Sequence, residues 1–293
     1  PEQLVERAAK LHYQALALTD ECSLAGVVRA HGEARRQNLK LIIGSRFVPE
    51  QCLAEIIVLA CNRNGYGNLS ELITLARAGS AKGQYHLSLN DFLKPQAGFE
   101  HLENLPDCLL LFKPGDPEQA ETWRPQLESL LKAFKGRIWL GLKRHYQTED
   151  VRPTTKLQAL ASKLGIPLVA TGGVEMHGRS RQPLHDTLTA IRLKPPVQEC
   201  GYALQPNAEH HMRSIQRLAA LYPESALLET LEISRRCTFS LDDIKYEYPI
   251  EIVPEGHTVK TYLRQETYAG AQRRYPEGLN ATVQAQLEEE LGL

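Results

Sequence analysis

Ala15-Leu16-Ala17-Leu18-Thr19-Asp20-Glu21 is a short apolar run that ends in a hydroxyl and two carboxylates. A run of this length, bounded by polar residues, predicts a buried strand. Ser23 follows it, and because Ser is a favoured N-cap, we expect a helix from there to about Gln37. The stretch therefore predicts one strand-to-helix unit whose polar residues lie at the carboxyl end of the strand.

The same alternation continues on both sides of this stretch. Apolar residues recur with helical spacing over residues 4–11, 68–78, 118–134 and 154–164, whereas short apolar runs fill residues 40–48, 54–60, 108–112, 137–142 and 167–171. Strands with continuous apolar character, separated by helices, predict parallel strands covered by helices. We expect an irregular βα barrel, because no glycine-rich nucleotide-binding motif of the Rossmann or P-loop type follows any of these strands.

The last third of the chain predicts helices without strands, at residues 184–193, 208–221, 225–237, 258–275 and 282–291. We therefore expect a barrel domain over residues 1–200 and a helical extension over residues 201–293. Proline and glycine gather at residues 249–256, which predicts a turn between domains there.

The bulk composition is that of an ordinary globular protein, with 293 residues, 42% apolar residues and a net charge of −1. The near-neutral charge excludes a strong whole-surface attraction to nucleic acid. The six cysteines form no C-x-x-C pair, so we expect reduced thiols of a cytoplasmic protein and no zinc knuckle. No apolar run is long enough to cross a membrane. Pro1 and Glu2 suit a first helical turn, so an upstream segment is expected to be missing.

Polar residues follow several predicted strands, where βα barrels build their active sites. They are Asp20, Glu21, Arg46, His145, Glu175 and His177. Asp20 and Glu21 could serve a metal or acid–base site, or could merely favour the start of the next helix.

Two further groups contain potential metal ligands. Glu175 and His177 point the same way in an extended segment, which suits zinc or manganese, although two ligands do not make a site and a polar loop would look the same. Glu209-His210-His211 is interpreted as an exposed helix start, because adjacent helical residues face different directions. No nucleophile elbow of the G-x-S-x-G type occurs, so a catalytic triad receives no support.

Several longer stretches carry a family resemblance. They are Ala17-Leu18-Thr19-Asp20-Glu21-Cys22-Ser23-Leu24-Ala25-Gly26, Leu41-Ile42-Ile43-Gly44-Ser45, Gly65-Tyr66-Gly67-Asn68-Leu69-Ser70-Glu71-Leu72-Ile73, Leu184-His185-Asp186-Thr187-Leu188-Thr189-Ala190-Ile191-Arg192, Glu199-Cys200-Gly201-Tyr202-Ala203-Leu204-Gln205-Pro206-Asn207-Ala208-Glu209, and Tyr246-Glu247-Tyr248-Pro249 with Val253-Pro254-Glu255-Gly256. In this order they resemble the PHP (polymerase and histidinol phosphatase) domain of bacterial polymerase III alpha subunits, most of all the error-prone branch. The resemblance implies a PHP-type barrel without its first strand, from a polymerase that works in damage-induced synthesis.

The resemblance also implies what lies outside this chain. The His-x-His metal motif of the family would precede Pro1, and the palm aspartates that hold Mg²⁺ for polymerisation would follow Leu293. DNA, deoxynucleoside triphosphates and polymerase accessory proteins are the implied partners of the full-length protein, in the cytoplasm and without a membrane.

Within the chain, the implied metal ligands are mostly replaced. Glu21 stands where active members have His, Arg46 stands where they have an acidic residue, and Gly141 stands at an acidic strand-end position. The final Asp-x-His motif is matched by Gly173-Val174-Glu175, so Asp20 alone keeps its type. We therefore expect a remnant site without catalysis and without metal.

At this remnant site, residues Asp20, Glu21, Arg46, His145, Glu175 and His177 should converge, with Arg46 among Asp20, Glu21 and Glu175. Removal of a buried Arg46 would then cost roughly 3 kcal/mol. Two alternatives remain open at this point, a metal-dependent phosphodiesterase or proofreading exonuclease and a non-catalytic docking module.

Overall fold

The computed structural model describes residues 1–115, 119–145, 151–244 and 252–292. The chain divides into two compact units, Pro1–Ile244 and Lys245–Leu293. This division differs from the expected boundary near residue 200, because helices after that point still pack on the sheet. Residues 249–251 of the expected inter-domain turn lie outside the described residues.

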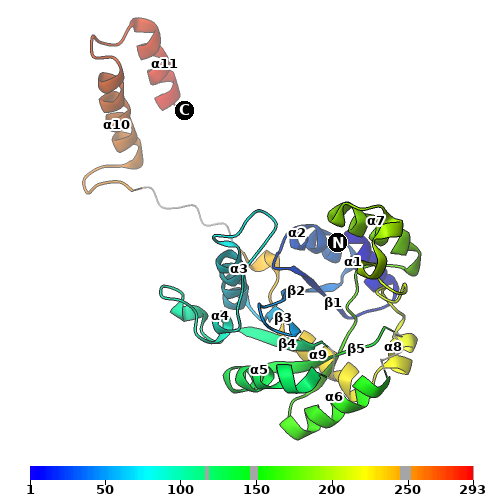
Figure 1. The fold of residues 1–293 in the computed structure, drawn as a ribbon. Coiled ribbons are helices and arrows are strands. Elements are labelled where there is room, and N and C mark those ends of the chain that lie inside the picture. The colour runs from blue at the N-terminus through cyan, green and yellow to red at the C-terminus, as the bar shows by residue number, and fades with distance from the viewer. Residues whose placement is uncertain (116–118, 146–150, 245–251, 293) are drawn as a thin grey trace. The chain divides into compact units, whose positions relative to one another are not determined.

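The first unit is built around a six-stranded sheet whose strands follow chain order and curl into half a barrel (Figure 1). Its strands are β1 (Ala15–Glu21), β2 (Lys40–Phe47), β3 (Ala54–Ala60), β4 (Cys108–Pro114), β5 (Ile138–Lys143) and β6 (Leu168–Thr171). The expected α/β architecture is confirmed, and each strand begins and ends within about two residues of its predicted position.

One expectation about the sheet is wrong, because the strands are not all parallel. β1 and β2 are parallel, as are β4, β5 and β6, but β3 runs antiparallel to both of its neighbours. The connection from β2 to β3, residues 48–53, is too short for the crossover that parallel neighbours need. The start of β3 therefore lies at the same edge as the ends of the other strands.

Helices cover the outer face of this sheet. α3 (Arg63–Arg77), α5 (Ala120–Ala133) and α6 (Val151–Leu164) pack on β3, β4 and β5, while α1 (Glu2–Lys10) and α2 (Val27–Gln37) pack on β1 and β2. α2 begins after Gly26, not at Ser23, because the Ser23 hydroxyl accepts from the Ala25 N–H in a preceding turn. Trp123 and Phe112, both fully buried, mark the centre of the larger core.

A helix also packs on the inner face. α9 (Glu224–Arg236) contributes Ile233 to a cluster with Ile42, Trp139 and Val169, and Trp139 donates its indole N–H to Glu229 at 2.6 Å. This burial explains why the first unit extends beyond residue 200. It also makes the structure an irregular half-barrel that is filled by a helix.

The remaining helices are α4 (Asn90–Leu93), α7 (Gln182–Leu193), α8 (Ile215–Leu221), α10 (Val259–Arg274) and α11 (Ala281–Gly292), of which the last two form the second unit. The helix expected over residues 208–221 begins only at Ile215, and the preceding residues form a bridge between Met176 and His211. In the described part of the chain, no helix combines the length and the apolar character that a membrane span requires.

Candidate functional site

Four charged side chains stand in a row across the edge of the sheet where β1, β2 and β4 end and β3 begins. The strand register places Glu21 beside Arg46, and Glu55 beside Lys113. Alternate residues of a strand face the same side, so all four side chains lie on the inner face, in the order acid, base, acid, base. We call Glu21, Arg46, Glu55 and Lys113 the charged row.

Ion pairs connect the members of the charged row. Arg46 Nη2 lies 2.6 Å from Glu21 Oε2, and Arg46 Nη1 lies 3.6 Å from Glu55 Oε2. Lys113 Nζ lies 2.5 Å from the same Glu55 oxygen, and its side chain is only 9% exposed. The row is therefore an alternating ion-pair network that is most buried at Lys113.

The electrostatics of the row stabilise the charged form of Glu55. Partial burial alone would raise the pKa of this carboxyl, but the charge and hydrogen bond of Lys113, with Arg46 and Lys143 behind it, lower the pKa below its usual value. At the other end, Tyr85 donates its hydroxyl to Glu21 at 3.1 Å, and burial with the nearby carboxylate raises the pKa of Tyr85 to about 12. Tyr85 therefore stays a neutral donor.

Asp20 lies outside this network. It alternates with Glu21 along β1 and so faces the opposite side of the sheet, where its Oδ2 accepts from the Gly26 N–H at 3.0 Å. A Cβ on Gly26 would stand 2.7 Å from that oxygen, which explains the glycine. Asp20 thus organises the turn before α2, and the expectation that Arg46 stands beside Asp20 is wrong.

A second group of polar residues forms around His145, just beyond the end of β5. Its Nε2 lies 2.7 Å from Gly172 O, and since a carbonyl can only accept, this nitrogen carries the proton. The His210 ring packs against it with 3.8 Å between ring centroids, and His210 Nδ1 donates to Gly173 O at 3.1 Å. His145 and His210, which we call the histidine pair, are 1% and 3% exposed.

Burial keeps the histidine pair uncharged. Desolvation lowers the pKa of both rings to about 4, and the nearby Lys143 charge acts in the same direction on each. Glu209 and His210 are buried and His211 is partly buried, so the interpretation of this triplet as an exposed helix start is wrong. The buried ion pair of Glu209 with Arg213, 3.2 Å long, fixes the segment in place.

Gly141 and Gly173 make room for these groups. A Cβ on Gly141 would stand 3.4 Å from Lys113 Cβ, so the glycine lies directly beside the charged row. Gly173 has a φ of +52° and would place a Cβ 3.1 Å from the His145 ring. The absence of a side chain at these two positions therefore lets Lys113 and His145 pack closely against the backbone. Lys143 also passes close to Gly173, between the charged row and the histidine pair.

Glu175 and His177 separate, contrary to the expectation that they point the same way. Glu175 Oε2 lies 2.9 Å from His185 Nε2 and 3.7 Å from His210 Nδ1, so it joins the histidine pair. His177 instead faces Arg181, with 3.4 Å between His177 Nε2 and Arg181 Nε. The ion-pair partners found for Arg46 are Glu21 and Glu55, so the expectation that it stands beside Glu175 is also wrong.

A metal cluster, which the PHP resemblance implies, needs several available nitrogen and oxygen donors around one point. Both carboxylates of the charged row already face cationic nitrogens, and Lys143 adds a further positive charge nearby. In residues 1–115, 119–145, 151–244 and 252–292, no group of three or more His, Cys, Asp and Glu side chains is placed to hold a metal ion. The residues of this edge therefore do not fit such a cluster.

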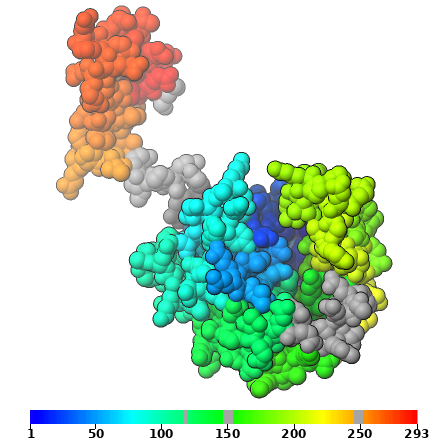
Figure 2. Space-filling view, in the orientation of Figure 1, coloured from blue at the N-terminus to red at the C-terminus, as the bar shows by residue number. Residues whose placement is uncertain are grey.

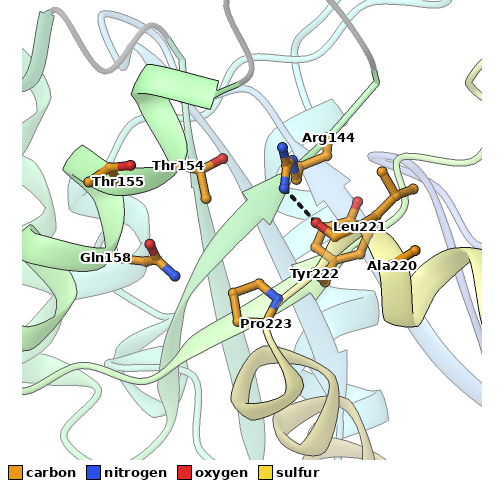
Figure 3. Close-up of a pocket in the computed structure, with 8 residues that line it drawn as sticks. All are labelled: Arg144, Thr154, Thr155, Gln158, Ala220, Leu221, Tyr222 and Pro223. Atoms are coloured by element: carbon orange, nitrogen blue, oxygen red, sulfur yellow. Dashed lines mark hydrogen bonds between the residues drawn. The ribbon is translucent and has the colours of Figure 1, made fainter.

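A cavity of about 360 Å³ lies between the end of β5, the first turns of α6 and the junction of α8 and α9 (Figure 3). It is lined by Arg144, Thr154, Thr155, Gln158, Ala220, Leu221, Tyr222 and Pro223. Arg144 donates to Leu221 O at 2.6 Å, which ties β5 to the end of α8. Of the described residues that line this cavity, none belongs to the charged row or the histidine pair.

The space-filling view shows which segments of the first unit lie on one face of the molecule. Blue segments from the first quarter of the chain lie between cyan residues near α3 and α4 and the yellow-green region of α7 (Figure 2). Segments distant in sequence thus lie next to one another on this face (Figure 2).

Comparison with known proteins identifies a PHP domain in the first half of the chain. The sequence profile of the PHP domain matches residues 1–145, which contain the whole charged row and His145. An amidohydrolase structure from Chromobacterium violaceum is also similar, at 13% identity and a TM-score of 0.41, over 58% of this chain and 80% of that one.

The more particular match is to error-prone DNA polymerases. The chain is 52% identical to the one from Bordetella parapertussis over 297 aligned residues and 50% identical to the one from Dechloromonas aromatica over 296, in both cases over 100% of this chain and 28% of the relative. Over its whole length the chain is similar to proteins named error-prone DNA polymerase, and it spans about 28% of the length of these curated relatives.

Replacement of Arg46 by Met is expected to lower the free energy of unfolding by about 1 kcal/mol, less than the roughly 3 kcal/mol of a fully buried pair. The Arg46 side chain is 31% exposed, and Glu55 retains Lys113 while Glu21 is 44% exposed. Urea denaturation measures the change. Arg29→Met, which removes a more exposed partner of Glu2, is the matched control and should cost less. A loss of roughly 3 kcal/mol would instead show that Arg46 alone neutralises this edge.

Proposed function

We propose that this chain is the PHP-containing part of a DNA-directed DNA polymerase that acts in error-prone, damage-induced DNA synthesis. The observation that carries this is the 50–52% identity across the whole chain to relatives named error-prone DNA polymerase. In the parent enzyme, palm carboxylates outside this chain would hold Mg²⁺, and the substrates would be DNA and deoxynucleoside triphosphates. The cytoplasm is the corresponding location.

For the PHP domain itself, we propose a scaffold without hydrolytic activity. The charged row supports this, because Arg46 and Lys113 supply fixed positive charge where a metal-dependent enzyme would collect cations. In this proposal the remnant site, Asp20, Glu21, Arg46, Gly141, His145, Gly173, Glu175 and His177, maintains the sheet edge and performs no chemistry. Such a scaffold is compatible with docking of polymerase accessory proteins.

The purified 293-residue chain is expected to release no nucleotide from a DNA 3′ end above background, with Mg²⁺, Mn²⁺ or Zn²⁺ added. Its metal content after purification without chelator should be well below one ion per chain. Release that depends on metal and disappears in Glu175→Gln would support the phosphodiesterase or proofreading alternative instead.

Polymerase function needs a separate test, which uses the full-length parent protein on a primed template. Extension with all four deoxynucleotides and Mg²⁺ is expected. An extension-negative parent would contradict the polymerase proposal without affecting the scaffold proposal, because the two assays use different parts of the protein.

A further inference from the structure

Two cysteines from distant parts of the chain meet at the end of the inner face of the sheet. Cys61 directly follows β3, and Cys237 directly follows α9. The Cys61 carbonyl accepts from the N–H groups of Thr238 at 2.7 Å and Phe239 at 3.1 Å. The two backbones therefore lie as close as neighbouring strands. Cys237 is buried and Cys61 is partly exposed.

The two thiols interact with each other. A hydrogen bond between the Cys61 and Cys237 side chains lowers the pKa of Cys61, with help from the Arg236 and Arg137 charges, and raises the pKa of Cys237. Burial raises the pKa of the other perturbed thiols, at Cys22, Cys52 and Cys108. Cys61 therefore combines access to solvent with the greatest thiolate character among these perturbed thiols, and these are the properties of a reactive cysteine.

We propose that Cys61 and Cys237 are a redox-sensitive dithiol that closes to a reversible disulfide when the protein meets a peroxide. This modification site lies outside the charged row and goes beyond the proposed polymerase function. The shared backbone hydrogen bonds, together with the packing of both cysteines in one cluster on the inner face, carry the assignment. A disulfide needs α-carbons roughly 4.4–6.8 Å apart, a separation that adjacent hydrogen-bonded backbones provide.

The reaction balances with hydrogen peroxide as the oxidant. The Cys61 thiolate attacks one peroxide oxygen, the O–O bond breaks, and the leaving hydroxide takes a proton to become water. The Cys237 thiol then loses its proton and its sulfur attacks the Cys61 sulfenic acid, which forms the S–S bond and releases a second water. The two thiols lose two electrons and the peroxide gains them. A dithiol reductant reverses the change by exchange.

The bond would join two elements that now meet through backbone hydrogen bonds and apolar packing. α9 packs on the inner face through Ile233 and Cys237, and Cys61 stands at the end of a strand of that same sheet. Oxidation would therefore fasten the end of α9 to the end of β3.

The test is a thiol titration of the reduced chain in denaturant, before and after exposure to a small excess of hydrogen peroxide. The number of free thiols should fall from six to four, because two of the six cysteines would pair. Peptide mapping should find Cys61 linked to Cys237, with a mass about 2 Da below the sum of the two thiol peptides, and dithiothreitol should restore six thiols.

Matched variants separate this proposal from general oxidation. Cys61→Ser should form no disulfide, Cys237→Ser should stop at a sulfenic acid that a dimedone probe labels on Cys61, and Cys52→Ser should behave as the parent chain. The mapping of the unaltered chain does not depend on whether Cys237→Ser folds. Retention of all six thiols, a bond from Cys61 to Cys108, or oxidation of Cys61 to sulfinic acid without a disulfide would overturn the proposal.

Discussion

Acidification from pH 7 to pH 5 is expected to lower the free energy of unfolding of the first unit by about 3 kcal/mol, because two buried neutral histidines resist protonation. Burial lowers the pKa of His145 and His210 to about 4 in the folded chain, against an ordinary value near 6.5. Between these values the unfolded chain binds more protons than the folded chain, so stability rises with pH. It is fully present above about pH 6.5 and is lost as the pH falls toward 4.

Urea denaturation at a series of pH values measures this dependence, and Glu55 does not confound it because its lowered pKa lies below the window. His210→Gln should reduce the slope by removing one titrating ring. His86→Gln, which replaces a histidine whose side chain is 67% exposed, is the matched control and should reduce the slope less than His210→Gln does. A pH-independent stability between 5 and 7, or a His145 resonance that titrates near 6.5 by NMR, would contradict the buried neutral pair.

Replacement of Lys113 by Met should lower the free energy of unfolding by roughly 3 kcal/mol at neutral pH, because it leaves the Glu55 carboxylate without its closest cation. Lys113 is 9% exposed and Glu55 is 28% exposed, so the pair is largely shielded from water. Without Lys113 the pKa of Glu55 should rise. The destabilisation should therefore shrink as the pH falls below about 4.5, where the carboxyl becomes neutral.

A double variant isolates the electrostatic part of this effect. Glu55→Gln combined with Lys113→Met should recover much of the lost stability, because no unpaired charge remains. Arg124→Met breaks a surface pair with Glu128 on α5 and should cost less than about 1 kcal/mol. Equal losses for Lys113→Met and Arg124→Met would show that the charged row is no more than a solvated surface network.

The sequence located the strands well because their apolar runs are short, continuous and bounded by polar or turn-forming residues. Ala15–Glu21 and Ala54–Ala60 illustrate this, since the runs in the sequence and the observed strands coincide. The helix expected from residue 208 was less well placed, because the buried contacts of Glu209 and His210 hold that segment in an irregular loop. The spacing of apolar residues within a short stretch gives no information about contacts with residues that lie far away in the chain.

Two members of the charged row were predicted from the sequence, a third could have been predicted in the same way, and the fourth could not. Glu21 and Arg46 were found because they follow apolar runs. Lys113 directly follows the predicted run 108–112 and could have been found by the same signal. Glu55 stands at the start of β3, and on the expectation of parallel strands it would have been placed at the opposite edge of the sheet.

By itself the sequence determined the α/β class, the positions of the strands and the family resemblance. The reason is that the pattern of apolar residues and the order of the motifs can be read directly from the sequence. The short connection between the runs 40–48 and 54–60 could already have indicated an antiparallel β3. The tertiary structure alone decided that β3 pairs with β4 as well as β2, and with it the pairing of Glu55 with Lys113 and Arg46. It also decided that Asp20 and Glu175 lie apart from Arg46. The physical reason is that strand direction and side-chain facing depend on which strands pair, and pairing is settled by the packing of the whole sheet against its helices.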